Sequence, residues 1–389
     1  MESPKILIVT YNSPILNYVV DSVIKSSTHF NKPKIIILDS YRYGKAYNYN
    51  NDGITYLRYS DLIEYIGRIS DKLMLSKNDK ILLKHRFFSN PGLPRSFGAA
   101  LYKRGPVLSL DDDSIIDKGI ISTYYNAVKT GKEVIIFDNK FGVPDLSLFE
   151  WLRIKIASYL TKRQALGMIN NKTAYTKKLI EDRQLFSYSL KVYSNIFEKD
   201  TNLIDIQNVP LPPRKHVNGS CFFTLAENLI KNPMPTLYDE DWTWETILRL
   251  KQVQVSISKR AFLHYNNERN NRKADRLWSK DGLYNEEFGK IFGKVFEYFL
   301  YSKIDISRIP PIKIVEKAHE YAIKSVDNKI ALAYNIAMLM KDNQNKERIV
   351  CLLSNLQEEI SKISAEEILD EIRFYYLTKK FIGLVHSVI

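Results

Sequence analysis

The first 40 residues show strand, helix and strand patterns in turn, and this order constrains the fold more than any other feature of the chain. Lys5–Thr10 (KILIVT) and Lys34–Leu38 (KIIIL) are short apolar runs rich in β-branched residues, as expected for strands buried on both faces of a parallel sheet. Between them, Asn12-Ser13-Pro14 is typical of a helix start. A strand–helix–strand unit predicts a right-handed crossover and a parallel sheet with helices on its faces.

The alternation of strands and helices continues to about residue 260. Further strands are predicted at Ile54–Arg58, Pro106–Leu110, Glu133–Phe137, Ser220–Thr224 and Gln254–Ser258, and helices at Leu62–Leu75, Pro94–Arg104, Ile116–Thr130 and Trp242–Lys251. From about Glu286 onward the patterns are helical only. We therefore predict an α/β domain of residues 1–285 and an all-helical C-terminal domain of residues 286–389.

Size, charge and cysteine content narrow the class of protein. At 389 residues the chain is long enough for one large α/β domain and a smaller second unit. Two cysteines form no disulfide framework, and no basic segment followed by an apolar one opens the chain, so we expect a cytoplasmic protein. The net charge of +13 favours an anionic partner, and nucleic acid, acidic lipid and phosphorylated small molecules all satisfy it.

Three consecutive aspartates, Asp111-Asp112-Asp113, follow the predicted strand Pro106–Leu110. Open α/β sheets bind ligands at the carboxyl ends of their strands. If the strand stays extended, Asp111 and Asp113 project to one side about 6–7 Å apart. There they can share a divalent cation and leave it positions for diphosphate oxygens. The alternative is structural, because the same cluster could cap the helix that begins near Ile116.

Several short segments resemble, in the expected order, the motifs of inverting GT-A glycosyltransferases. In chain order, these motifs are a first strand and turn, a second strand end, a helix with an arginine, a metal-binding DxD motif, a small-residue segment, an acidic pair and a histidine. These segments are Ile8–Asn12, Leu38–Ser40, Leu93–Ala100, Leu110–Asp113, Asn218–Phe223, Glu240–Trp242 and His264. The resemblance implies a Rossmann-like GT-A fold with a mostly parallel central sheet flanked by helices. It also implies that about residues 1–115 bind the nucleotide sugar and about residues 116–285 the acceptor.

The resemblance assigns the nucleotide sugar to residues at the strand ends, the helix arginine, the aspartate motif and the small-residue segment. These residues are Thr10, Tyr11, Asn12, Asp39, Arg95, Asp111, Asp112 and Gly219. A carboxylate at position 39 can accept a hydrogen bond from the imide N–H of uracil or guanine. We therefore expect a UDP- or GDP-sugar as the donor.

The metal site implied by the resemblance contains Asp111, Asp113 and His264. Breaking a sugar–diphosphate bond leaves a nucleoside diphosphate, whose developing charge needs a cation. Asp113 is the expected direct ligand of Mn²⁺ or Mg²⁺, and Asp111 would reach the metal through water or contact the ribose. A neutral His264 could supply a nitrogen ligand, although a lone histidine can also be structural.

The acidic pair Glu240-Asp241 supplies the candidate for general base. The acceptor hydroxyl must lose a proton as it attacks the anomeric carbon, and a carboxylate beside the sugar pocket can take that proton. The resemblance favours Asp241 for this role, with Glu240 as its neighbour. The alternative is that Asp239-Glu240-Asp241 caps the helix that follows.

We therefore predict a metal-dependent glycosyltransferase (EC 2.4 class) that transfers a sugar, with inversion, to a hydroxyl of a glycan, lipid-linked or small-molecule acceptor. A retaining transferase and a nucleotidylyltransferase share such a sheet and such carboxylates, and their products would distinguish them. A basic nucleic-acid-binding protein is the alternative outside enzymology. The sequence contains no nucleic-acid-binding motif, so we expect no nucleic acid partner.

The last predicted helix allows a second kind of partner. Residues 372–389 mix Arg373, Lys379 and Lys380 with aromatic and aliphatic side chains. Such a helix could lie on an anionic membrane, as would suit a lipid-linked acceptor. This would place the protein at the inner face of the membrane. The alternative is a terminal helix that packs on the rest of the chain.

Overall fold

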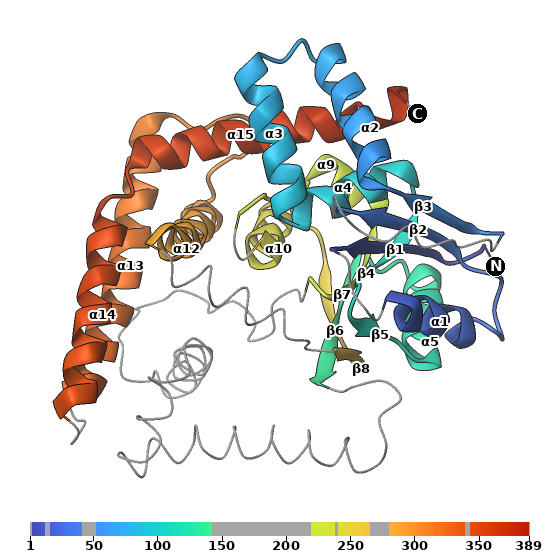
Figure 1. Ribbon diagram of the computed structural model, residues 1–389, viewed down its shortest axis with the longest axis horizontal. Coiled ribbons are helices and arrows are strands. Elements are labelled where there is room, and N and C mark those ends of the chain that lie inside the picture. Colours follow the sequence, from blue (N-terminus) through green and yellow to red (C-terminus); the bar gives the residue numbers. More distant parts are fainter. Residues whose placement is uncertain are drawn as a thin grey trace.

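The computed structural model describes residues 2–11, 16–40, 52–141, 219–237, 240–264, 280–338 and 343–388. Eight strands form one mixed sheet in the order β3-β2-β1-β4-β7-β6-β8-β5 (Figure 1). Their bounds are β1 Lys5–Thr10, β2 Lys34–Asp39, β3 Ile54–Leu57, β4 Pro106–Asp111, β5 Ser114–Ile115, β6 Val134–Phe141, β7 Cys221–Leu225 and β8 Val255–His264. The first four strands in spatial order are parallel. β7 is antiparallel to both of its neighbours, β5 is antiparallel to β8, and β6 and β8 are parallel.

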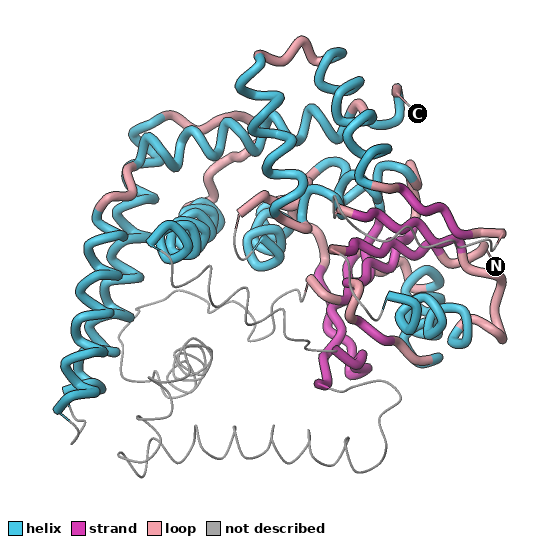
Figure 2. The backbone as a smooth tube through the Cα atoms, viewed as in Figure 1, coloured by secondary structure: helices cyan, strands magenta, loops and turns pink. Residues whose placement is uncertain are grey.

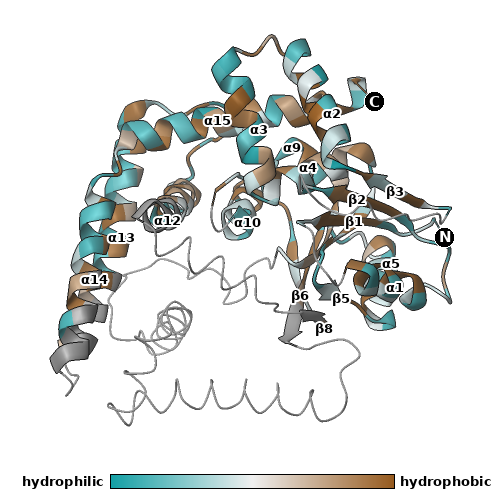
Figure 3. Cartoon of the chain, in the orientation of Figure 1, coloured by the Kyte–Doolittle hydropathy of each residue, from teal (hydrophilic) through white to brown (hydrophobic). Residues whose placement is uncertain are grey.

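Helices cover both faces of this sheet. On one face lie α1 (Leu16–Ser26) and α5 (Lys118–Lys129), and on the other α2 (Tyr59–Lys72), α3 (Lys77–Ser89), α4 (Gly92–Leu101) and α9 (Ala226–Lys231). Successive strand side chains point to opposite faces, so Leu7 packs with α4, whereas Ile6 and Ile8 pack with α1 and α5. In Figure 3 the central strands are apolar along their length, whereas the covering helices carry both polar and apolar residues.

The C-terminal region is a helical layer beside the sheet (Figure 2). It contains α12 (Lys280–Tyr301), α13 (Ile312–Met338), α14 (Asn343–Ser361) and α15 (Ala365–Gly383), and a short 3-10 turn, Val385–Ser387. α10 (Glu240–Leu250) lies between this layer and the sheet. A hydrophobic cluster joins α10 to the layer, because Ile247 packs together with Phe296 of α12 and Val315 of α13.

The last helix returns to the sheet and joins its core. α15 passes behind α3 in Figure 1, and Phe374 and Phe381 belong to the same hydrophobic cluster as Leu7. Arg86 of α3 pairs with Glu371 of α15 at 3.1 Å. The boundary predicted at residue 285 falls inside α12, and the hydrophobic core contains residues from both sides of it.

The structure does not support the interpretation that the helix of residues 372–389 lies on a membrane. Phe374 and Phe381 are 7% and 0% exposed, and Ile382 and Val385 are fully buried. These apolar side chains would have to face outward to enter a membrane. The alternative, a packed terminal helix, describes α15. In the described part of the chain no helix is sufficiently long and apolar to cross a bilayer.

The fold class predicted from the sequence is confirmed, and the differences are local. The sheet is mixed and mostly parallel, helices flank it, and an all-helical extension follows. The predicted strand bounds are correct to within one or two residues except for β6 and β8, which run on to Phe141 and His264. Helices α3 and α9 were not predicted. The strand bounds that matter for the site are those of β1, β2 and β4.

Candidate functional site at the carboxyl edge of the sheet

The aspartate motif forms a turn rather than an extended strand end. β4 ends at Asp111, the chain turns at Asp112 and Asp113, and β5 begins at Ser114. The condition under which Asp111 and Asp113 would project to the same side is therefore not met. The backbone carbonyl of Ser220 fixes this turn by accepting hydrogen bonds from the Asp111 amide (2.9 Å) and the Ser114 hydroxyl (2.8 Å).

The structure also decides against the capping alternative for the aspartate motif. α5 begins at Lys118, and its N-cap is Asp117, whose carboxylate accepts a hydrogen bond from the Ile120 amide at 3.1 Å. The two residues of β5 and Ile116 thus separate the motif from the cap. The acidic side chains of the motif are not needed to begin this helix.

Asp112 joins the ends of β1 and β4. Its carboxylate is 3% exposed, and one oxygen accepts hydrogen bonds from the Thr10 hydroxyl (2.7 Å) and from the Tyr11 amide (2.8 Å). A buried carboxylate needs such partners. The predicted nucleotide contacts of Asp112 and Thr10 stay predictions. Their described role is to hold two strand ends together.

Arg95 of α4 is the buried cation of the site. Its side chain is 1% exposed and pairs with two carboxylates, that of Asp111 through Nη2 and that of Glu240 through Nη1, the latter at 3.1 Å. Burial alone would lower the pKa of Arg95, but the charges of Asp111, Glu240 and Asp241 outweigh it and raise the pKa. The guanidinium therefore stays charged and links the end of β4 to the start of α10.

Gly219 allows the chain to pass close to this guanidinium. A Cβ atom at this position would lie 3.0 Å from Nη1 of Arg95 and 3.3 Å from Nη2, which is tighter than ordinary packing allows. The Gly219 amide donates a hydrogen bond to Oδ2 of Asp241 at 2.9 Å. The small-residue segment therefore contacts both the basic and the acidic parts of the site.

The acidic pair forms the first turn of α10. Asp241 accepts hydrogen bonds at both oxygens, from the Gly219 amide and from the Trp242 amide, the latter at 2.8 Å. Glu240 contacts Arg95. Asp241 lies inside the helix and bonds the amide of the next residue, whereas an N-cap side chain bonds an amide two or three residues further on. Asp239, the first residue of the capping alternative, lies outside the described residues. Its role as general base remains a prediction.

Asp39 lies at the end of β2, where the nucleobase is expected. Its carboxylate is 4% exposed and accepts a hydrogen bond from the Tyr56 hydroxyl at 2.5 Å. Nearby, burial raises the pKa of the Tyr11 hydroxyl, and the charge of Arg95 partly opposes this shift. Tyr11 therefore connects the expected base side of the site with the charged centre.

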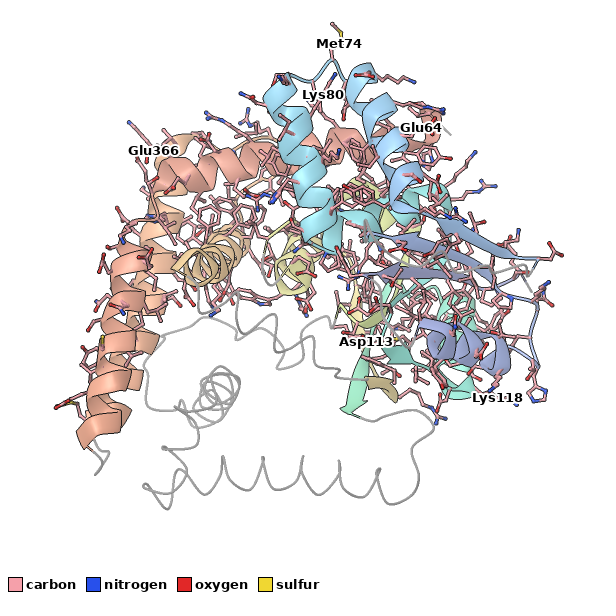
Figure 4. All side chains as sticks on the ribbon, in the orientation of Figure 1. Glu64, Met74, Lys80, Asp113, Lys118 and Glu366 are labelled. Carbon is pink, nitrogen blue, oxygen red and sulfur yellow. The ribbon has the colours of Figure 1, made fainter. Side chains whose placement is uncertain are left out.

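The structure describes no side chain for two of the predicted site residues, Asn12 and His264. Asn12 lies outside the described residues. Only the backbone of His264 is described, and it pairs with Ser114, the residue after Asp113. Among the side chains that the structure describes, no group of three or more histidine, cysteine or acidic residues is arranged to hold a metal ion. In Figure 4 Asp113 lies at the end of the sheet that faces α10 and α12.

Sequence reasoning did not assign site contacts to Tyr56, Ser114 and Ser220. Tyr56 donates to Asp39, the Ser220 carbonyl accepts from the Asp111 amide, and Ser114 donates to that same carbonyl. Tyr56 lies in a strand whose side chains are partly exposed, and tyrosine in such a strand is common. The two serines act through a backbone carbonyl, which leaves no signal in the sequence. These contacts follow only from the pairing of strands that are far apart in the chain.

The parallel strands β3-β2-β1-β4, followed by antiparallel β7, form a mixed α/β sheet with an acidic turn at the carboxyl end of β4. The chain is similar in structure to S. aureus TarS, at 12% sequence identity and with a TM-score of 0.39, over 92% of this chain and 55% of the TarS chain. TarS residues 1–349 give TM-scores of 0.37 alone and 0.41 in complex with UDP-GlcNAc, with 90% and 91% of those chains covered. The chain therefore spans about half the length of full TarS.

No protein-family model matches this chain. No curated protein matches it in sequence.

Proposed function

We propose that the chain is a metal-dependent glycosyltransferase that moves a sugar from a UDP- or GDP-sugar to an acceptor hydroxyl. The observation that carries this proposal is the buried Arg95, which pairs with Asp111 at the carboxyl end of β4 and with Glu240 at the start of α10. Such an edge is where open α/β sheets bind ligands. The charged pairs hold a basic group and the carboxylates of Asp111 and Glu240 together at this edge.

The donor half of the site would hold the diphosphate together with Mn²⁺ or Mg²⁺. Asp111 and Asp113 supply carboxylate oxygens, which suit a hard divalent cation. Since the described side chains form no three-residue metal group, the diphosphate would provide further ligands, and cation and nucleotide would bind together. When bound, the cation would neutralise charge on the departing diphosphate.

The acceptor half of the site would use Asp241 as general base. Both of its oxygens are held by backbone amides, so the direction of the carboxylate is fixed before the acceptor arrives. A carboxylate oxygen has a second lone pair, and this pair is available to an acceptor hydroxyl. With the base opposite the leaving diphosphate, attack would invert the anomeric carbon.

Metal-dependent nucleotide binding tests the donor half of the proposal. We expect UDP or GDP to raise the melting temperature in the presence of Mn²⁺, and EDTA to abolish most of the increase. Calorimetry should give weak binding of Mn²⁺ alone and tighter binding once the nucleotide is present. Asp113→Asn should weaken the metal-dependent part. Equal nucleotide affinity with and without a divalent cation would contradict the proposal.

The reaction products test the class of enzyme. A screen of UDP- and GDP-sugars should include UDP-GlcNAc, the compound in the TarS complex, and should follow slow donor hydrolysis until an acceptor is found. Nucleoside diphosphate with an inverted product supports the proposal. A retained anomeric bond indicates a retaining transferase, and pyrophosphate indicates a nucleotidylyltransferase.

A further inference from the structure

The helical layer contacts the first turn of α10 through two residues of α12, Gly293 and Lys294. A Cβ atom at Gly293 would lie 2.6 Å from Cζ3 of Trp242 and 2.9 Å from Oγ1 of Thr243. Glycine inside a helix is unfavourable compared with alanine. Here it lets α12 lie directly against the residue that follows Asp241 in the chain.

The charged end of the Lys294 side chain lies over the ring of the same tryptophan. Its ammonium lies 5.1 Å from the centre of the Trp242 ring, within the range of a cation–π interaction. The same ammonium pairs with Glu297 at 2.5 Å, and the two side chains are only 17% and 8% exposed. Solvent therefore screens this pair much less than a surface pair.

Glu297 extends the contact to the next helix. Burial raises the pKa of Tyr301 on α12 and of Tyr321 on α13, and the negative charge of Glu297 raises both further. Burial, aided by the charge of Glu297, raises the pKa of Tyr321 to about 12, so its phenol stays protonated near neutral pH. Lys294 is thus held from α12 and α13, while its charged end lies over Trp242.

Trp242 transmits this support to the site. Its amide donates the 2.8 Å hydrogen bond to Oδ1 of Asp241, and Glu240, two residues before it, contacts Arg95. A shift of the indole would move the amide that orients the Asp241 carboxylate. A misplacement of about 1 Å can cost roughly 10²-fold in rate.

We infer that Gly293 and Lys294 are positioning residues for the proposed base: α12 fixes Trp242 and, through it, the direction of the Asp241 carboxylate. This inference depends on the proposed function for its kinetic consequence, but the structural coupling between α12 and α10 can be measured without activity. It gives the helical layer a part in catalysis although its described residues do not include the site carboxylates.

Lys294→Met removes the cation and keeps most of the side-chain volume, and Lys290→Met is its matched control. Lys290 lies one turn earlier on α12 and pairs with Glu287 at 2.6 Å in the same i,i+3 arrangement. We expect Lys294→Met to lower kcat roughly 10- to 100-fold with unchanged donor affinity, and Lys290→Met to leave both near wild type. Lys294→Arg keeps a cation over the ring and should restore most of kcat.

Hydrogen exchange gives a second measurement that needs no substrate. The amides of residues 240–243 should exchange faster in Lys294→Met and in Gly293→Ala than in wild type or Lys290→Met. If this occurs but no sugar nucleotide is turned over by the wild type, the proposed function fails and the positioning contact stands. If Lys294→Met and Lys290→Met behave alike in exchange, or in kcat where turnover is detected, the inference is wrong.

Discussion

At the residue scale, Arg95 neutralises two carboxylates from distant parts of the chain, Asp111 and Glu240. Arg95→Met would leave both without this cation in a poorly hydrated place. Breaking a buried ion pair typically costs about 3–5 kcal/mol, and we expect a loss of this size in urea unfolding. Arg373→Met is the control, because the Arg373–Asp370 pair is 58% and 71% exposed and should contribute less than about 1 kcal/mol. Equal losses in the two variants would show that Arg95 is not the buried charge centre.

Asp241 should matter for turnover far more than for donor binding. The base acts only as the acceptor attacks, so Asp241→Asn should lower kcat by about 10²–10⁴-fold while donor affinity stays near wild type. An amide can accept a hydrogen bond at its oxygen but not at its NH₂ group, so one of the two backbone amides now bonded to Asp241 would lose its acceptor. Thermal unfolding must therefore be measured in parallel. Wild-type turnover in this variant would show that another residue is the general base, and Glu240 would be tested next.

The sequence predicted which residues lie near the site but not how they contact one another. The order of motifs pointed to Arg95, Asp111 and Glu240, and the structure brings these three together. The contact of Asp112 with Thr10 joins residues about a hundred positions apart. Such a bond depends on the register of two strands, which a single sequence does not specify.

At the scale of elements, α4 packs on the sheet because Gly98 has no side chain. A Cβ atom there would lie 2.3 Å from Cδ1 of Leu7 and 3.1 Å from Cδ1 of Leu38. We expect Gly98→Ala to destabilise the protein by about 1–3 kcal/mol through overpacking. Gly67→Ala is the matched control, because Gly67 lies in α2 and an added methyl there meets nothing within 4 Å. That variant should be neutral or about 0.5–1 kcal/mol more stable, and urea unfolding of both measures the contrast.

Tyr124 of α5 ties its helix to two strands and makes stability depend on pH. Its hydroxyl donates to the Pro106 carbonyl at 3.1 Å and accepts from the Lys5 amide at 3.3 Å, and burial raises its pKa to about 12. The unfolded tyrosine loses its proton near pH 10, so this contribution is complete below pH 10 and is lost as the pH rises toward 12. Each pH unit in that window should cost about 1.4 kcal/mol for this residue.

Tyr124→Phe tests this contribution. The variant should be less stable than wild type at pH 8, and the difference should shrink between pH 10 and 12 in urea unfolding. Tyr376 and Tyr321 also have a pKa raised to about 12, so the variant should keep part of the pH dependence. A difference that stays constant over this window would contradict the assignment.

Strands and helices were predicted well where local patterns decide them. β1 and β2 are continuous apolar runs, and their bounds follow from the sequence. α3 was missed because polar and apolar residues are spread around it without a clear stripe. The pairing of β7 antiparallel to β4 could not be predicted, because it depends on the whole chain. Local pattern thus predicts elements, whereas the position of each strand in the sheet depends on tertiary contacts.

At the scale of the whole molecule, the helical layer and the sheet share one core. Phe381 of α15 is fully buried and stacks against Phe97 of α4 at a ring-centre distance of 6.4 Å. Phe381→Ala should therefore destabilise the entire protein by about 3–5 kcal/mol, with a single transition by circular dichroism and by tyrosine fluorescence. Cleavage between residues 302 and 311 should give no stable nucleotide-binding fragment. A fragment of residues 1–302 that folds and binds nucleotide would contradict this expectation.

The packing of α15 on α4 has a consequence for synthesis on the ribosome. Phe97 and Leu93 emerge early, whereas their partner Phe381 is translated almost three hundred residues later. At about 5–20 residues per second, the face of α4 that α15 covers stays uncovered for roughly 15–60 seconds. During that time the nascent chain presents an apolar surface to its surroundings. Apolar surface exposed for this long during synthesis is of the kind that promotes aggregation unless chaperones cover it.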